Sequence, residues 1–305
     1  MKSSYLYILL AALIICSAAN AHGCVPDTPA RVLVVIAHPD DESEMAVTLY
    51  KIAKEHHGTV DIAVITNGEA GYKYSTLAEA YYNISLTNEQ VGRRKLPAIR
   101  KQELKNAGRI IGIHRYYFLN QPDAHFTLNE REPIDTSWNV PYVKKALLTV
   151  LNKNRYDIVL TLLPVAQTHG AHKAATLLAL EVVNSLPAAR RPVVLAVATR
   201  EKGNAVPSFG NDGKYTLCHT TADTASFFTD RTQCFSYMNR MNYKVIANWE
   251  IAEHKSQGYT QMTMNVGDLE EFWSFTLNTP ARLDWCRSLF EVLKTPPPAL
   301  AKTTY

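Results

Sequence analysis

The sequence predicts an α/β protein built on a doubly wound, mostly parallel sheet, followed by a less regular C-terminal portion. Between about residues 32 and 200, short apolar runs alternate with longer amphipathic stretches, which is the pattern of parallel strands joined by crossover helices. The apolar runs are continuous rather than alternating, so we expect helices to cover both faces of the sheet. Residues 203–232 are rich in Gly, Asn, Asp, Ser and Thr, and the regular pattern weakens from there.

Five apolar runs are expected to form the strands: residues 32–37, 61–66, 116–119, 157–162 and 192–197. Five stretches are expected to be helical: residues 42–57, 88–112, 140–154, 169–184 and 237–257. Thr87 and Thr168 are candidate N-caps for the second and fourth of these helices. Asn67 and Gly68 form a turn signal after the second strand. The aromatic-rich segment 262–290 is expected to add strands and a last helix.

The first 21 residues have the features of a secretory signal peptide. Lys2 provides a positive start, residues 5–15 form an apolar core, and the small residues Ala19 and Ala21 precede a cleavage point. We therefore expect export, either to a periplasm or out of the cell. An uncleaved N-terminal anchor is the alternative.

Cleavage would leave one mature domain over residues 22–292, with the less regular portion from about residue 203 packed on it. Residues 293–305 include a run of prolines and are expected to form a flexible tail. No stretch of the mature chain approaches the length of a transmembrane helix. The sequence contains no indication of the oligomeric state.

The charge of the chain is too mild to indicate a nucleic-acid partner. The formal net charge at pH 7 is +4, which becomes +3 if Lys2 is removed with the signal peptide, because residues 1–21 contain no other charged side chain. Lysines and arginines form no cluster along the chain. We expect no nucleic acid among the partners.

The mature chain contains four cysteines, and an even number in an oxidising compartment allows two disulfides. Their positions are Cys24, Cys218, Cys234 and Cys286. We expect Cys218 to pair with Cys234, because they are close in sequence, which leaves Cys24 to pair with Cys286. The spacing of these cysteines is not that of a zinc site.

The segment AHPDDESE, residues 37–44, directly follows the first predicted strand. Acidic residues in the first turn of a helix complement its macrodipole, which accounts for the carboxylates without any function. It does not account for His38 at the end of the strand. His38 and Asp41, on a tight strand-to-helix turn, can face one ion, whereas Asp40, next to Asp41, should point elsewhere, toward a water or substrate. The segment therefore indicates either a capped helix or a metal site.

A second motif, Thr-His-Gly-Ala-His, follows the fourth predicted strand. His169 and His172 are three residues apart and share one helix face. Ligands of doubly wound sheets bind beyond the carboxyl ends of the strands, and both motifs occupy such ends. One carboxylate with two or three imidazoles suits zinc with an open position for water. A pair of unrelated surface histidines is the alternative.

AHPDDE followed about 130 residues later by His-x-x-His resembles the PIG-L/LmbE family of zinc-dependent sugar de-N-acetylases. Weaker matches support this resemblance at residues 66–71, 100–104, 121–123 and 254–257. The resemblance covers roughly residues 31–257 and implies a Rossmann-like, LmbE-type fold.

The resemblance also implies a role for each matching residue. It implies three ligands of a Zn²⁺ cofactor: His38, Asp41 and His172. Asp40 would be the general base that deprotonates the attacking water. His169 would stabilise the oxyanion and protonate the leaving amine. Arg100 and Asp123 match positions that contact the sugar substrate.

The chain departs from the family at Ala171, where relatives commonly have Asp in a His-x-Asp-His motif. His169 is then either less basic or paired with another carboxylate. The expected function is an exported zinc-dependent amidohydrolase that removes an N-acetyl group from an amino sugar of a saccharide or glycoconjugate. The alternatives are a weakly active or non-catalytic saccharide-binding protein, motivated by Ala171, and a zinc hydrolase of peptides or esters.

Overall fold

The structure is a computed structural model that describes residues 29–209 and 214–296. The predicted signal peptide, Cys24 and residues 297–305 of the predicted tail lie outside the described residues. All statements about the fold refer to the described residues.

A seven-stranded sheet forms the centre of the fold, with the strand order β3-β2-β1-β4-β5-β9-β6. The five strands from β1 to β5 are parallel, and β9 and β6 join them as antiparallel strands at one edge. The strands are β1 (Arg31–Ile36), β2 (Thr59–Thr66), β3 (Ile113–Gln121), β4 (Ile158–Leu162), β5 (Val193–Arg200), β6 (Phe227–Asp230) and β9 (Leu269–Ser274). The predicted fold class, a mostly parallel α/β sheet, is confirmed.

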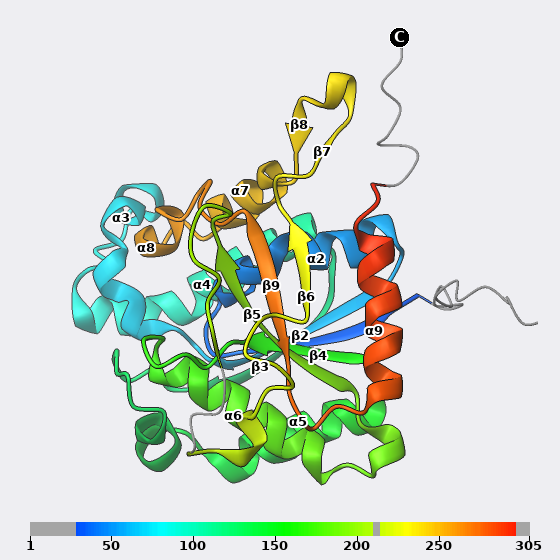
Figure 1. Cartoon of the computed structure of the whole chain (residues 1–305). Coiled ribbons are helices and arrows are strands. Elements are labelled where there is room, and N and C mark those ends of the chain that lie inside the picture. Colours follow the sequence, from blue (N-terminus) through cyan, green and yellow to red (C-terminus); the bar gives the residue numbers. More distant parts are fainter. Residues whose placement is uncertain (1–28, 210–213, 297–305) are drawn as a thin grey trace, which may run out of the picture.

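Helices cover both faces of this sheet (Figure 1). The α-helices are α2 (Ala46–Tyr50), α3 (Thr76–Tyr82), α4 (Glu89–Ile111), α5 (Val140–Lys153), α6 (Gly170–Ser185), α7 (Lys244–Glu253), α8 (Gly258–Gln261) and α9 (Pro280–Leu293). Short 3-10 or π turns are η1 (Asp41–Met45), η2 (Lys51–Glu55), η3 (Glu69–Tyr74), η4 (Pro133–Ser137), η5 (Ala188–Arg190), η6 (Thr216–Cys218) and η7 (Tyr237–Asn239). In the described part of the chain, no helix is both long and apolar enough to cross a membrane.

The core lies on the two sides of the sheet, and β1 contributes to both. Val32, Val34 and Ile36 pack with residues of α2, α4, α7 and α9 on one face. Leu33 and Val35 pack with residues of α5 and α6 on the other face. The connections after β1 and after β4 therefore pass over opposite faces of the sheet. The carboxyl ends of β1 and β4 thus form the switch point of the sheet, the place where such folds bind ligands.

Three predictions about local structure need correction. The N-caps are Asn88 and His169, one residue after the predicted Thr87 and Thr168. The helix predicted over residues 237–257 is broken into η7, the short hairpin strand β8 (Met241–Asn242), which pairs with β7 (Cys234–Phe235), and α7. Met238 has a φ of 53°, and a left-handed backbone at that position cannot continue a right-handed helix.

Among the described residues, Cys234 and Cys286 are free thiols. Both predicted pairings are therefore wrong: Cys234 is not bonded to Cys218, and Cys286 is not bonded to its expected partner Cys24, which itself lies outside the described residues. Cys218 packs in the cluster with α6 on one face of the sheet. Cys234 is exposed on the short hairpin strand β7, and its neighbour Phe235 packs in the cluster on the opposite face. Cys286 is buried among apolar side chains, and this burial raises the pKa of its thiol.

The C-terminal portion is joined to the parallel sheet through a buried carboxylate on β9. Glu270 accepts hydrogen bonds from the backbone N–H groups of Val47 and Thr48, at 2.9 and 2.8 Å. These donors belong to the first turn of α2, where N–H groups lack partners inside the helix. Arg231 donates to the same carboxylate from Nε at 2.9 Å. The helix that follows the AHPDDE turn is therefore capped by a residue from the other end of the chain.

We expect Glu270→Gln to destabilise the protein by roughly 3 kcal/mol, because it leaves the Arg231 guanidinium buried without its counter-charge. The change would be measured as the free energy of unfolding in urea. The control is Asp135→Asn, which breaks the exposed pair with Arg131 and should cost less than about 1 kcal/mol. Equal effects of the two substitutions would contradict a stabilising role for the buried pair of Glu270 with Arg231.

Candidate functional site

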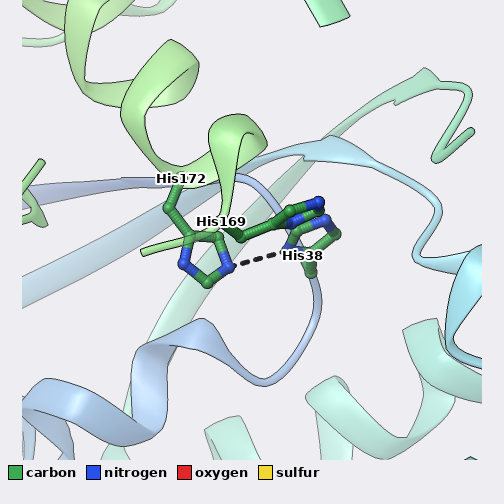
Figure 2. A group of neighbouring side chains, drawn as sticks. All are labelled: His38, His169 and His172. Carbon is green, nitrogen blue, oxygen red and sulfur yellow. Dashed lines mark hydrogen bonds between the residues drawn. The ribbon is translucent and has the colours of Figure 1, made fainter. Parts of the chain in front are cut away.

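The two histidine motifs meet at the carboxyl edge of the sheet. β1 leads into the turn that contains His38 and Asp41, and β4 leads into the loop and first turn of α6 that contain His172. β1 pairs with β4 in parallel, with Val34 opposite Leu160, so the two strands end side by side. Figure 2 shows the rings of His169 and His172 approaching that of His38.

Three side-chain atoms form a compact triangle at this edge. His172 Nε2 lies 3.1 Å from His38 Nδ1 and 3.1 Å from Asp41 Oδ1. His38 Nδ1 and Asp41 Oδ1 are 3.5 Å apart. Tetrahedral zinc with bonds of about 2.0–2.2 Å places its ligand atoms roughly 3.3–3.5 Å from one another. The donor types and separations of this triangle therefore fit a zinc ion.

Asp41 and His172 each use their other polar side-chain atom for hydrogen bonds, which leaves the atoms of the triangle available to bind an ion. Asp41 Oδ2 accepts from the backbone N–H groups of Ala37 and His38 at 3.0 and 2.9 Å, so Oδ1 remains for an ion. Thr168 Oγ1 lies 3.1 Å from His172 Nδ1, so Thr168 holds the ring of His172 instead of capping α6. Partners of this kind fix the orientation of metal-binding side chains.

Asp123 lies on the far side of the His38 ring. Its Oδ1 is 3.6 Å from His38 Nε2, and its Oδ2 accepts from the N–H of Ala70 at 3.2 Å. A carboxylate behind a ligating histidine orients the ring and makes it a stronger ligand. The structure therefore places Asp123 against a predicted metal ligand, and its predicted contact with the sugar stays a prediction.

The electrostatics of the triangle favour a cation. Burial disfavours the charged form of His38, but the carboxylates of Asp123 and Asp41 outweigh this effect and raise the pKa of His38 to about 10. Burial likewise opposes ionisation of Asp41, yet His172 and His38 hold its pKa well below the usual value. Burial also acts against ionisation of Asp123, and the nearby His38 still lowers its pKa to about 2. Two ionised carboxylates thus surround these imidazoles.

Asp40, the predicted base, is held at both carboxylate oxygens. Oδ1 accepts from Arg100 Nη2 at 2.6 Å, and Oδ2 accepts from Thr260 Oγ1 at 2.5 Å. The backbone N–H of Asp40 donates to Glu42 Oε2 at 2.9 Å, so Glu42 supports the turn. The φ of Asp40 is 129°, a conformation that needs such support from its surroundings. As expected for adjacent residues, Asp40 and Asp41 make different contacts.

Arg100 lies inside the protein rather than on an open surface. It is 3% exposed and donates to the carbonyl oxygens of Gly68 and Pro39 at 2.5 and 2.6 Å, in addition to Asp40. In this arrangement Arg100 connects α4 to the turn after β1. Its predicted contact with the sugar is not tested by these interactions.

His169 is stacked between two rings. Its ring centroid is 5.0 Å from that of His38 and 5.0 Å from that of Phe126, with interplanar angles of 19° and 6°. Its Nε2 lies 3.2 Å from the carbonyl oxygen of His125. Burial and the nearby His38 and His172 lower the pKa of His169 to about 4. The ring is therefore neutral and donates its Nε2 proton to the His125 carbonyl.

Ala171 is buried and, with His169, lines a small cavity of about 20 Å³, enough for about one water. Among the described residues, no carboxylate forms a hydrogen bond with the His169 ring. The hydrogen-bond partner of His169 is instead a backbone carbonyl. Of the two possibilities left by Ala171, the structure indicates a less basic His169.

The sequence did not point to several residues that support this site. Thr260, His125 and Phe126 lie in segments without hydrophobic periodicity.

His254, from the weakly matching segment 254–257, is fully buried, with Nε2 at 2.8 Å from Glu42 Oε1 and 3.1 Å from a Glu250 oxygen. His254 therefore supports the AHPDDE turn through its contact with Glu42.

Comparisons with known proteins match this chain to a family of deacetylases. Residues 33–183 match the PIG-L family, described as GlcNAc-PI de-N-acetylase. Over 176 residues, the chain is 31% identical to a probable N-acetyl-alpha-D-glucosaminyl L-malate deacetylase 2 from Bacillus cereus, covering 58% of this chain and 71% of the relative.

Two solved structures share the fold. One is N,N'-diacetylchitobiose deacetylase from Pyrococcus horikoshii, with a TM-score of 0.51 and 18% identity, covering 89% of this chain and 93% of the other. The other is a conserved protein from Thermus thermophilus, with a TM-score of 0.50 and 20% identity, covering 80% of this chain and 93% of the other. At these identities the likeness shows the common fold.

We expect the affinity for zinc to rise with pH, because His38 must lose its proton before it can bind a metal. With the pKa of His38 raised to about 10, protons compete with zinc for His38 across neutral pH. For an ordinary histidine this competition would end near pH 7. The apparent association constant should therefore rise about tenfold per pH unit between about pH 6 and 8 from this group alone. Competition with a chromophoric chelator would measure it.

The control for this prediction is Asp123→Asn, which removes the carboxylate that contributes most to raising the pKa of His38. The pH dependence should be shallower in this variant. A zinc affinity that is independent of pH in the unmodified protein would contradict the prediction.

Proposed function

The chain belongs to the PIG-L family of de-N-acetylases, and from this premise we propose that it is an exported, zinc-dependent hydrolase of N-acetylated amino sugars. The substrate would be an N-acetylglucosamine-type unit in a saccharide or glycoconjugate. The observation that carries the proposal is the triangle of His38, Asp41 and His172, whose facing atoms are 3.1–3.5 Å apart. The relative from Bacillus cereus, named as a deacetylase of a glucosaminyl malate, supports the choice of sugar.

A zinc ion at this triangle would polarise the acetamide carbonyl and lower the pKa of the attacking water. Asp40 would accept the proton of that water, and an ionised carboxylate is suited to this because it offers only acceptor atoms. Arg100 contributes by holding Asp40 Oδ1 at 2.6 Å. The base therefore keeps its position relative to the adjacent residue Asp41, which would hold the metal.

His169 would act on the oxygen and nitrogen of the amide. Its Nε2 proton is donated to the His125 carbonyl, a contact that substrate can replace. A preorganised N–H directed at the developing oxyanion typically contributes about 2.7–4 kcal/mol to lowering a barrier. The stacked rings of His38 and Phe126 keep the plane of His169 fixed while this exchange takes place.

Export is proposed from residues 1–21 alone, which have the charge, apolar core and small residues of a signal peptide. Fractionation of cells that express the full chain, with N-terminal sequencing of the product, tests it. We expect an N-terminus at His22. An unprocessed chain that remains inside the cell would contradict export without affecting the proposed chemistry.

We expect Asp40→Asn to retain zinc, because the three candidate ligands His38, Asp41 and His172 are unchanged, and to lose acetate release by about 10²–10⁴-fold, because the carboxylate that accepts the proton is gone. Asn has the shape of Asp, and both are enriched at positive φ compared with other residues, so the substitution should add no backbone strain to the turn. Acetate would be measured with N-acetylglucosamine oligomers as substrate, with and without a chelator, and zinc by elemental analysis.

The matched control is His172→Ala, which should lose both zinc and activity. Full activity of Asp40→Asn would refute its role as the base. Activity of the unmodified protein that resists the chelator would refute zinc dependence. If the protein binds these oligomers but releases no acetate in the presence of zinc, the saccharide-binding alternative is correct.

We expect Ala171→Asp to raise the turnover number by roughly tenfold, equivalent to about 1.4 kcal/mol of the barrier. The added carboxylate would enter the cavity beside His169 and stabilise its protonated form. Ala171→Asn, of the same size but uncharged, is the control and should give no gain. An unchanged turnover number for Ala171→Asp would mean that the His125 carbonyl already serves as a sufficient partner.

A further inference from the structure

Thr260 reaches the predicted base from a distant part of the chain. It lies on α8 (Gly258–Gln261), and its hydroxyl donates to Asp40 Oδ2 at 2.5 Å across a separation of 220 residues. The match to the PIG-L family ends at residue 183, so Thr260 lies outside the part of the chain that the family describes.

The contact is significant because Asp40 has only two oxygens and each is held by one side chain. Arg100 holds Oδ1, and Thr260 holds Oδ2. With only Arg100 in place, the carboxylate could still rotate about its last torsion, which has a broad energy minimum. A second donor on the other oxygen fixes that rotation. The hydroxyl oxygen of Thr260 also keeps its acceptor capacity for a water or substrate hydroxyl.

The position of α8 is itself fixed by contacts on the α4 side of the site. Ser256, just before α8, donates from its backbone N–H and its hydroxyl to the buried Glu103 of α4, at 2.8 and 2.6 Å. A Cβ on Gly258 would lie 2.9 Å from the carbonyl oxygen of Tyr74, so the backbone of α8 packs closely against η3. The ring of Tyr259 contacts that of Tyr74, with centroids 5.7 Å apart.

We propose that Thr260 is a positioning residue for Asp40, whose hydroxyl holds the carboxylate of the base in one orientation. The catalytic half of this inference rests on the proposed function, in which Asp40 is the base. Its structural half concerns only the orientation of Asp40. If Thr260 merely stabilised α8, its removal would lower stability but leave both the orientation of Asp40 and the turnover number unchanged.

The test compares Thr260→Val, which removes the hydroxyl but keeps the shape, with Thr260→Ser, which keeps the hydroxyl. In zinc-loaded protein, we expect kcat for acetate release to fall about ten- to a hundredfold in the valine variant, since misplacement of a reacting group by about 1 Å costs up to this factor. KM should stay within about twofold, and the serine variant should restore kcat. Thr232→Val is the matched control, because it breaks a similar hydroxyl–carboxylate bond to Asp230, at 2.7 Å, outside the predicted site.

A second measurement, independent of activity, is the crystal structure of each metal-free variant. We expect the Asp40 carboxylate to rotate in the valine variant and to stay in place in the serine variant. An Asp40 that keeps its orientation in the valine variant, with kcat unchanged, would overturn the proposal. If the unmodified protein releases no acetate, the proposed function fails, and the orientation of Asp40 in the two variants still decides the positioning role. If the valine variant does not fold, Thr260→Ala replaces it in both measurements.

Discussion

The parallel pairing of β1 with β4 is the constraint on which the site depends. The two histidine motifs are separated by more than a hundred residues, and His38 and His172 nevertheless lie 3.1 Å apart, nitrogen to nitrogen. Parallel strands that pair in register end at the same edge of the sheet, and the chain after β1 and the chain after β4 leave toward opposite faces. The turn after β1 and the start of α6 therefore meet at this edge, where His172 contacts both His38 and Asp41.

Residues from other parts of the fold set the charge at this edge and stabilise its strained backbone. Asp41 and Asp123 surround His38 with negative charge, which raises the pKa of His38 to about 10 and makes a cation the natural occupant. Asp40 adopts a φ of 129°, and the contacts of its carboxylate and backbone with Arg100, Thr260 and Glu42 maintain that conformation.

The C-terminal portion contributes to the site although it contains none of the predicted catalytic or metal-binding residues. Glu270 caps the helix that follows the AHPDDE turn, His254 supports that turn through Glu42, and Thr260 holds the predicted base. These three contacts come from β9, from the end of α7 and from α8. A deacetylase core that ended near the last matched residue, 183, would lack all of them.

The sequence by itself determined the local features: the five parallel strands, the helices between them and the two motifs that supply the candidate ligands. These features are readable because periodicity and turn chemistry act over a few neighbouring residues. The tertiary structure alone decided the antiparallel pairing of β9 with β5 and β6, the contacts of Thr260 and His125, and the burial of Cys218 away from the exposed Cys234. Each of these depends on which distant segments pack together, and long-range packing leaves no local pattern in the chain. Arg100 shows the difference: its place in a motif was visible in the sequence, whereas its burial against Asp40 was not.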